Sequence, residues 1–184
     1  RAGLKIAHVS DLHMTGQRGR EFYDCVVELT NAWEPDLIAI TGDILEKEHC
    51  LPWILPTLGR LRAPDGKFFV LGNHEMRLPD VGPLRQLLAE AGFADLGSRC
   101  LTQSIRGCSV LLAGIELPWF GHEPPDEATP AALRILLSHS PDQLSWAKSR
   151  QFDLMLAGHT HGGQIRLPLV GALIAPSWHG SRYA

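Results

Sequence analysis

The segment Asp36-Leu-Ile-Ala-Ile-Thr-Gly-Asp43 decides the fold class of this chain. Its apolar residues follow one another with little alternation, which indicates a strand that is covered on both faces. Such strands are typical of α/β proteins. The run ends on a glycine and an aspartate, so a carboxylate stands directly after a buried strand. We therefore interpret the segment as an interior strand of an α/β fold with a polar residue at its carboxyl end.

Strand-like and helix-like segments alternate on both sides of this run. The expected strands are Leu4–Ser10, Asp36–Thr41, Lys67–Leu71, Cys100–Arg106, Ser109–Ile115, Leu133–Leu137, Asp153–Ala157 and a further one within Gly163–Pro168. The expected helices are, approximately, Arg20–Trp33, Pro52–Leu61, Val81–Ala91 and Pro141–Ser149. On the first helix, the helical spacing of Phe22, Val26, Leu29 and Trp33 predicts the face that packs on the core. The mixture of βα units with a central hairpin at Arg106-Gly107 favours a layered sandwich over one doubly wound sheet.

Length, charge and hydropathy limit what the chain can be. Its 184 residues, 45% of them hydrophobic, suit a single domain over residues 1–184 and are too few for two. The net charge of −3 provides no basic footprint, so nucleic acid is not an expected partner and nuclease activity is disfavoured. No apolar run approaches the length of a membrane span. The chain begins with Arg1, almost directly before a strand, which is compatible with an upstream signal or anchor that this sequence does not include.

Seven side chains that can bind metals stand at the ends of expected strands. They are Asp11, His13, Asp43, Asn73, His139, His159 and His161. Loops at the carboxyl ends of strands in α/β folds converge on one crevice. Imidazole and carboxylate together suit manganese, iron or zinc better than calcium. Seven ligands are too many for one ion, so the set indicates two cations about 3.5–4 Å apart that share Asp43, as in phosphoester hydrolysis.

Five further residues are candidates for catalysis or substrate binding. His74 follows the expected ligand Asn73, and we expect it to donate a proton to the leaving alkoxide or to bind a phosphate oxygen. We expect the neighbouring Glu75 to orient that imidazole and to raise its pKa. Trp119 and His122 in the proline-rich loop, and Arg166 beyond the last histidine motif, are candidate substrate contacts, although an ordinary surface role fits each of them equally well.

The motif order Asp-x-His, Gly-Asp, Gly-Asn-His-Glu, His and Gly-His-x-His resembles that of the calcineurin-like metallophosphoesterases, from about residue 5 to residue 165. The run Gly-His-Thr-His-Gly-Gly-Gln-Ile-Arg-Leu-Pro is similar to the bacterial phosphodiesterase branch, which includes membrane-associated members and some UDP-2,3-diacylglucosamine hydrolases. Two other branches fit less well, because Glu46 and Lys47 stand where protein Ser/Thr phosphatases carry Asp-Arg, and Glu46 stands where purple acid phosphatases carry a tyrosine.

The resemblance implies a fold and a site. The implied fold is a four-layer α-β-β-α sandwich with further strands of the second sheet beyond the tail, so that Ala184 would be a truncation point. One metal would take Asp11, His13, Asp43 and His161, and the other would take Asp43, Asn73, His139 and His159. A bridging water or hydroxide would attack phosphorus with the assistance of His74.

The expected function is that of a dinuclear metal-dependent phosphoester hydrolase, chiefly a phosphodiesterase. Its expected substrate is a small-molecule or lipid-linked phosphoester, and its expected location is the bacterial cytoplasm or a membrane reached through segments outside this chain. The alternative is a non-catalytic metal-binding scaffold of the same fold. The complete ligand set and the intact Asn73-His74 pair favour the enzyme.

Overall fold

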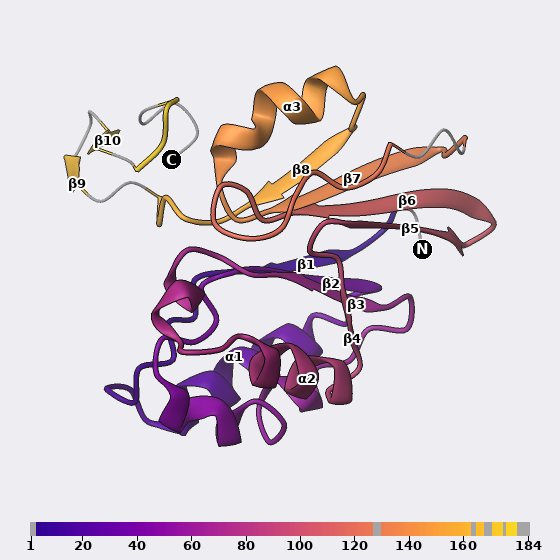
Figure 1. Ribbon diagram of the computed structural model, residues 1–184. Coiled ribbons are helices and arrows are strands. Elements are labelled where there is room, and N and C mark those ends of the chain that lie inside the picture. The colour runs from indigo at the N-terminus through magenta and orange to yellow at the C-terminus, as the bar shows by residue number, and fades with distance from the viewer. Residues whose placement is uncertain (1–2, 127–129, 163–164, 168–170, 175, 180–184) are drawn as a thin grey trace.

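Two four-stranded sheets lie face to face, and helices cover their outer sides (Figure 1). The computed structural model describes residues 3–126, 130–162, 165–167, 171–174 and 176–179, with the backbone alone for 165–167 and 171–174. The first sheet is parallel throughout, in the order β1 (Ile6–Val9), β2 (Leu37–Thr41), β3 (Lys67–Val70) and β4 (Phe93–Asp95). The second has the order β5 (Arg99–Ile105), β6 (Cys108–Ile115), β7 (Leu133–Ser138) and β8 (Leu154–Ala157), with β5 antiparallel to β6 and the others parallel.

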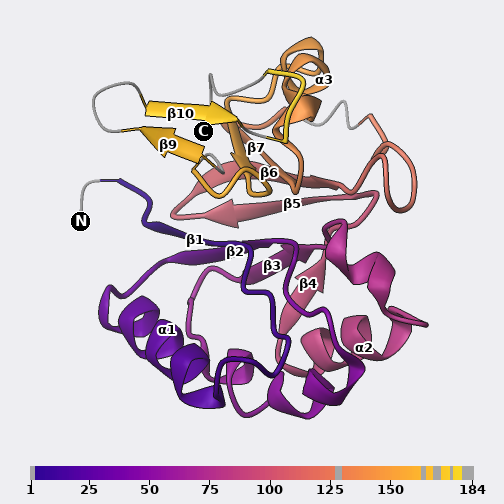
Figure 2. The ribbon, with the colours of Figure 1, turned by 90° about the vertical axis from the view of Figure 1, so that its left-hand side faces the viewer.

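The connecting helices are short. The α-helices are α1 (Arg20–Ala32), α2 (Gly82–Glu90) and α3 (Leu144–Ser149), and the 3₁₀ helices are η1 (Glu48–Trp53), η2 (Leu58–Arg60), η3 (His74–Arg77) and η4 (Pro141–Gln143). A separate antiparallel pair, β9 (Ile165–Leu167) and β10 (Gly171–Ile174), lies beside the sandwich (Figure 2).

Three hydrophobic cores separate the four layers, which confirms the α-β-β-α sandwich. The largest core lies between the first sheet and its helices, the second between the two sheets, and the smallest between the second sheet and α3. Strand β2 contributes to two of them, because Leu37 and Ala39 face the second sheet while Ile38 and Ile40 face the helices. This double coverage explains why the run that begins at Asp36 shows so little alternation.

The predicted core face of α1 is wrong. Leu29 is 68% exposed, Trp33 49% and Phe22 42%, whereas Tyr23 and Val27 are buried. The stripe that contains Phe22 and the adjacent stripe that contains Tyr23 both have helical spacing. The stripe with Tyr23 faces the sheet and is therefore the buried one. Basic side chains partly cover the exposed aromatic rings, since Lys5 stacks on Trp33 and Arg18 on Phe22.

Two other expectations also need correction. Instead of one helix over Pro52–Leu61, the chain forms the separate 3₁₀ turns η1 and η2, because Pro52 and Pro56 lack the N–H groups that an α-helix requires. The short strands β4 and β10 were not expected, since three or four residues carry too little periodic signal. The hairpin at Arg106-Gly107 is confirmed, with both residues at positive φ.

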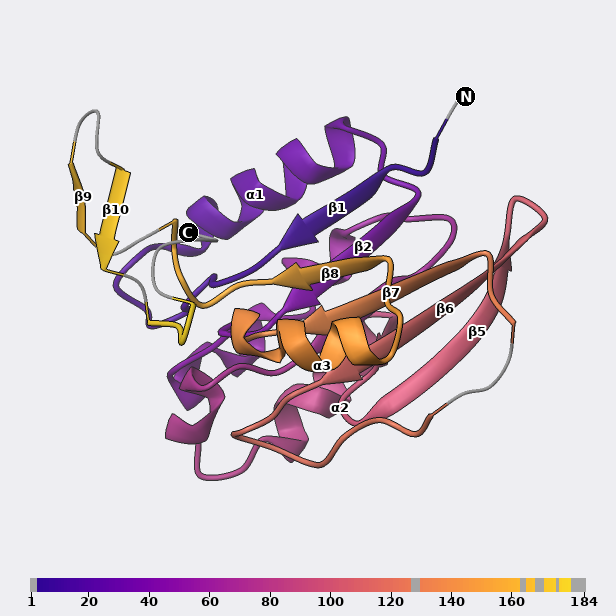
Figure 3. The ribbon, with the colours of Figure 1, turned by 90° about the horizontal axis from the view of Figure 1, so that it is seen from above.

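The parallel strands β1, β7 and β8 all point toward the same end of the sandwich (Figure 3). The expected ligands follow these strands and β2 and β3, so the topology carries them to one end of the molecule.

A buried ion cluster joins the two sheets near this end. Glu116, directly after β6, is 1% exposed and accepts hydrogen bonds from Leu71 N at 2.6 Å and from Arg85 at 2.6 Å. Arg85, on α2, also donates to both carboxylate oxygens of Asp95 at 2.8 Å. Burial raises the pKa of Glu116, and the Arg85 guanidinium opposes that rise. The cluster links α2, the edge strand β4 and the second sheet.

Replacing Arg85 with methionine is expected to lower the free energy of unfolding by about 3–5 kcal/mol, because the Glu116 charge loses its buried partner. Without the guanidinium the pKa of Glu116 rises further, so the folded variant takes up a proton that the unfolded chain does not hold. The deficit relative to the unmodified protein is therefore smaller at pH 5 than at pH 8. Urea denaturation at both pH values measures it, with the exposed Arg99→Met as control. An equal deficit in both variants would contradict this role of Arg85.

Candidate metal centre

The pairing of β1 with β2 continues past the ends of both strands, and this continuation brings three expected ligands together. Asp11 N donates to Gly42 O at 3.1 Å, and His13 N donates to Asp43 O at 2.8 Å. Met14 and Leu45 close the continuation as an isolated parallel bridge. The segments that carry Asp11, His13 and Asp43 therefore run side by side.

Close backbone approaches at two glycines bring in the remaining loops. Gly42 has a φ of +90°, and a Cβ at this position would lie 2.5 Å from Gly72 N, so only glycine lets the loops after β2 and β3 meet. At Gly158, after β8, a Cβ would lie 2.5 Å from Asp11 Oδ2 and 2.0 Å from Ser10 Oγ. This second approach crosses from the second sheet to the first.

Five of the seven expected ligands adopt left-handed backbone conformations: Asp11 (φ 56°), His13 (45°), Asp43 (51°), His159 (72°) and His161 (52°). Non-glycine residues rarely occupy this region, and each occurrence costs on the order of 1 kcal/mol or more. Such strain concentrates at functional sites, where the surrounding structure imposes it.

The ligand atoms form two groups. In the first, His13 Nε2 lies 3.1 Å from His161 Nε2, and His161 Nε2 lies 3.3 Å from Asp11 Oδ1. In the second, His139 Nε2 lies 3.2 Å from both Asp43 Oδ2 and His159 Nδ1, and 3.0 Å from Asn73 Oδ1. Asp43 Oδ2 is also 3.8 Å from His13 Nε2, so this carboxylate stands between the groups. The fold thus brings all seven expected ligands together.

The spacing within each group fits bound cations. Ligand atoms about 2.1 Å from one cation, at tetrahedral or octahedral angles, lie roughly 3.0–3.4 Å from one another. Two neutral imidazoles cannot both direct lone pairs at each other across 3.1 Å without a proton or a cation between them. Imidazole and carboxylate donors in this mixture suit zinc, iron or manganese.

Hydrogen bonds behind the ligands orient their rings. His139 Nδ1 lies 2.7 Å from Thr41 O, and His13 Nδ1 lies 2.7 Å from Glu46 Oε1. Nδ1–H therefore donates backward in both residues, which turns Nε2 toward the other ligand atoms. Burial opposes ionisation of Asp43, but the hydrogen bond with His139 prevails and lowers the pKa of the carboxyl group. The centre therefore presents an ionised carboxylate, which metal binding requires.

His74 has a different partner from the one expected. Its Nδ1 lies 2.7 Å from Glu46 Oε1, which also receives His13, while Arg77 binds the other oxygen of Glu46. The expectation that Glu75 orients His74 is therefore corrected. The sequence motifs Asp-x-His and Asn-His do not indicate that Glu46 binds both imidazoles. Its place three residues after Asp43 was the one sequence feature that pointed toward the site. Burial opposes ionisation of Glu46, yet the two histidines hold its pKa below the usual value.

Glu75 is fully buried and binds backbone N–H groups. Its carboxylate accepts hydrogen bonds from the N–H groups of Asp43, Ile44, Leu45 and Gly72 at 2.6–3.0 Å. Burial raises the pKa of Glu75 to about 7, against these four donors. Glu75 thereby joins the loop that carries Asp43 to the loop that carries Asn73.

The three expected substrate contacts have different surroundings. Trp119 lies at the site, with its ring 5.4 Å from the ring of His139 and 5.3 Å from that of His159. His122 is bound to Ser98 and to Glu123 O, and among the described residues it shares no contact with the ligands. Arg166 belongs to β9, and its side chain lies outside the described part of the chain.

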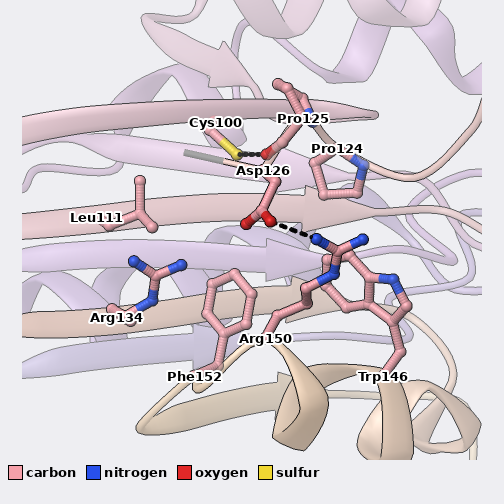
Figure 4. A pocket seen from close by; sticks show the side chains of 9 residues that line it. All are labelled: Cys100, Leu111, Pro124, Pro125, Asp126, Arg134, Trp146, Arg150 and Phe152. Carbon is pink, nitrogen blue, oxygen red and sulfur yellow. Dashed lines mark hydrogen bonds and ion pairs between the residues drawn. The ribbon is translucent and has the colours of Figure 1, made fainter. Parts of the chain in front are cut away.

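A small cavity under α3 lies apart from the metal centre. It lies near the start of β7, away from the end that carries His139, and Arg134, Trp146, Arg150 and Phe152 help to line it (Figure 4). Its volume of about 10 Å³ matches a single water molecule. Arg134 Nε and Trp146 Nε1 are buried and have no hydrogen-bond partner within the described part of the chain, and one water is a suitable acceptor for such donors.

Comparison with known proteins agrees with this geometry. The family model for calcineurin-like phosphoesterases matches residues 4–163. The chain belongs to this family. The match runs from β1 to the loop after β8, so both the fold and the loops that carry the expected ligands lie within the family's model.

Several relatives are similar over nearly the whole chain. The uncharacterized metallophosphoesterase YkuE of Bacillus subtilis is 32% identical over 96% of this chain and 64% of its own length. The phosphodiesterase YaeI of Escherichia coli is 31% identical over 95% of this chain and 67% of its own. The NAD nucleotidase NadN of Haemophilus influenzae shares the fold, with a TM-score of 0.55 and 16% identity over 92% of this chain and 42% of NadN. This metallophosphoesterase thus spans 42–67% of these proteins, and the prediction of a single domain over residues 1–184 stays a prediction.

Replacing Glu75 with glutamine is expected to lower the free energy of unfolding by about 3 kcal/mol, because an amide NH₂ would face backbone donors that need an acceptor. Metal content should fall with it, since the Asp43 loop loses its anchor. Urea denaturation and elemental analysis measure the two effects. Glu90→Gln, at an exposed site on α2, is the matched control and should change neither. An unchanged metal content in a destabilised Glu75→Gln would show that the anchor does not position the ligands.

Proposed function

We propose that this metallophosphoesterase is a dinuclear metal-dependent phosphodiesterase. The observation that carries the proposal is the position of Asp43 Oδ2, 3.2 Å from His139 Nε2 and 3.8 Å from His13 Nε2, between two groups of ligand atoms. One cation would be held by Asp11, His13, Asp43 and His161, and the other by Asp43, Asn73, His139 and His159. Two such cations would supply positive charge to the phosphoryl oxygens and lower the pKa of water.

His74 is the proposed proton donor. Its backbone N–H is fixed to Asp43 Oδ1 at 2.8 Å, and its ring stands edge-on to His13 with centroids 4.5 Å apart. Because Nδ1–H faces Glu46, Nε2 is the nitrogen left to face a substrate. To act as donor the ring would carry a proton on Nε2 as well as on Nδ1, and it would give the Nε2 proton to the leaving oxygen. Glu46 is thus a positioning residue for His74 and His13 together.

A phosphodiester is the proposed substrate class, supported by the name of the relative YaeI. The surroundings add a physical reason. Trp119 provides an apolar wall beside the second ligand group, and such a wall can receive the second ester arm that a monoester lacks.

Membrane association is proposed only through segments outside this chain. Another relative, in Bos taurus, is named as a transmembrane protein with a metallophosphoesterase domain and is 32% identical over 96% of this chain and 45% of its own length. Among the described residues, none of the helices has the length and apolar character to cross a bilayer.

Replacing Asp43 with asparagine is expected to remove bound metal and phosphodiesterase activity together, because the amide offers one neutral oxygen in place of a shared carboxylate. Bis-(p-nitrophenyl) phosphate hydrolysis and elemental analysis measure the two. The unmodified protein, stripped with a chelator and then resupplied with manganese, iron or zinc, should regain activity, whereas Asp43→Asn should not. Metal uptake without hydrolysis of any phosphoester in a substrate panel would favour the non-catalytic scaffold.

Replacing His74 with alanine is expected to lower kcat by about 10²–10⁴-fold while metal content stays intact, because the ring donates a proton and binds no cation in this proposal. The matched control is Met76→Ala, on the same 3₁₀ turn and 58% exposed, which should retain the rate. A His74→Ala protein with full activity, or one that has lost metal, would exclude the proposed role.

A further inference from the structure

A cavity of about 380 Å³ opens beside the first ligand group. Asp11, His13 and His161 line one side of it, and Thr15, Gln17, Arg18 and Phe22 line the other. Its size lies within the range of pockets that bind small ligands. A molecule whose phosphorus lies at the ligand group would therefore extend past the loop between β1 and α1.

Arg18 is the one arginine or lysine among the described residues that line this cavity. The remaining charged lining consists of metal ligands and of Glu46, whose second oxygen Arg77 already occupies. Nearby arginines are neutralised, since Arg20 and Arg60 both pair with Asp24. Within the described chain no carboxylate pairs with Arg18.

The Arg18 guanidinium has a defined position. It stacks on the Phe22 ring, with its central carbon 4.6 Å from the ring centroid. Stacking occupies one face of the planar guanidinium and leaves its N–H edges free for bidentate contact with an oxyanion. The Tyr23 ring lies edge-on to the Phe22 ring, and its hydroxyl donates to His13 O at 3.4 Å, so the Arg18–Phe22 pair lies close to the first ligand group.

The loop that carries Arg18 is packed against the body of the protein. Gly16 has a φ of +84°, and a Cβ there would lie 2.5 Å from the His49 ring. Gln17 N donates to Thr15 Oγ1 at 3.2 Å, which closes the turn. These contacts present the arginine at the cavity before any substrate arrives, which lowers the entropy lost on binding.

We propose that Arg18, held by Phe22, is a specificity residue that binds a second anionic group of the substrate, beyond the phosphate that reacts. The inference rests on the proposed phosphodiesterase function and narrows it to esters that carry an additional phosphate or carboxylate. The proposed cations would hold the phosphate that reacts, and Arg18 adds a separate positive charge for a second anionic group. An uncharged ester arm would gain nothing from it.

Three p-nitrophenyl phosphodiesters test the proposal. Their second arms are propyl, 3-carboxypropyl and 3-phosphopropyl, so they share a leaving group and differ in the terminal charge. The metal-loaded protein should show a kcat/KM about 10- to 100-fold higher for at least one anionic arm than for propyl, as expected for a charged hydrogen bond. The comparison of carboxylate with phosphate identifies which anion the substrate carries.

Variants of Arg18 and of the neighbouring Arg20 test whether Arg18 causes the preference for anionic esters. Arg18→Gln should reduce the ratio of kcat/KM between anionic and propyl esters to about one, and Arg18→Lys should leave an intermediate ratio because a point charge cannot bind bidentately. Arg20→Gln, two residues away and paired with Asp24, should keep the full ratio. Equal kcat/KM for all three esters in the unmodified protein, or a preference that survives Arg18→Gln, would overturn the inference while leaving the proposed function in place.

A binding measurement keeps the inference separate from catalysis. Calorimetry compares propane-1,3-bisphosphonate with propylphosphonate, neither of which can be hydrolysed. The bisphosphonate should bind about 10-fold or more tightly to the unmodified protein, and Arg18→Gln should abolish that difference. If no diester is hydrolysed at all, the phosphodiesterase proposal fails, and this comparison still decides whether Arg18 binds a second anion.

Discussion

The buried carboxylate of Glu75 is the interaction on which the site depends. Four backbone N–H groups, from the loops after β2 and β3, donate to it. Buried backbone donors must be satisfied, so these loops can take their positions only with acceptor oxygens between them. The side chains of Asp43 and Asn73 and the ring of His74 all extend from the loops that Glu75 joins. Glu75 therefore fixes the positions of two expected ligands and of the proposed proton donor, although its own carboxylate is fully buried.

The geometry of the centre is energetically unfavourable for the protein without bound cations. Five of the expected ligands occupy the left-handed region, imidazole nitrogens face each other at 3.1 and 3.2 Å, and a carboxylate is buried among them. The facing imidazoles and the carboxylate favour a positive charge between them, and the free energy of cation binding would offset the backbone strain as well. The packed sheets on either side supply the stability that lets this strain persist. Such local violations of folding rules are expected where function requires them.

The surroundings of the two ligand groups differ in chemistry. Trp119 presents an aromatic wall to His139 and His159, while Arg18 and Gln17 line the cavity beside Asp11 and His161. An elongated ester would therefore meet an apolar surface at one end and a cation at the other. Glu46 accepts hydrogen bonds from both His13 and His74, so it links an expected ligand to the proposed proton donor. In the proposed mechanism the ligands contact only phosphate and metal, so these flanking side chains would select the substrate.

Most of the strands, and the seven polar residues that meet at one end of the sandwich, could be predicted from the sequence, because continuous apolar runs and the polar residues that end them are local features. The period of α1 was equally clear, but whether Phe22 or Tyr23 faces inward depends on where the sheet lies, and only the tertiary structure decided it. The same holds for Glu46 and Glu75. Both are acids next to motif residues, and their partners are distant in sequence, so no spacing rule could tell that one receives two imidazoles and the other four backbone amides. Local pattern determines which residues can act, whereas packing between the loops determines which of them meet.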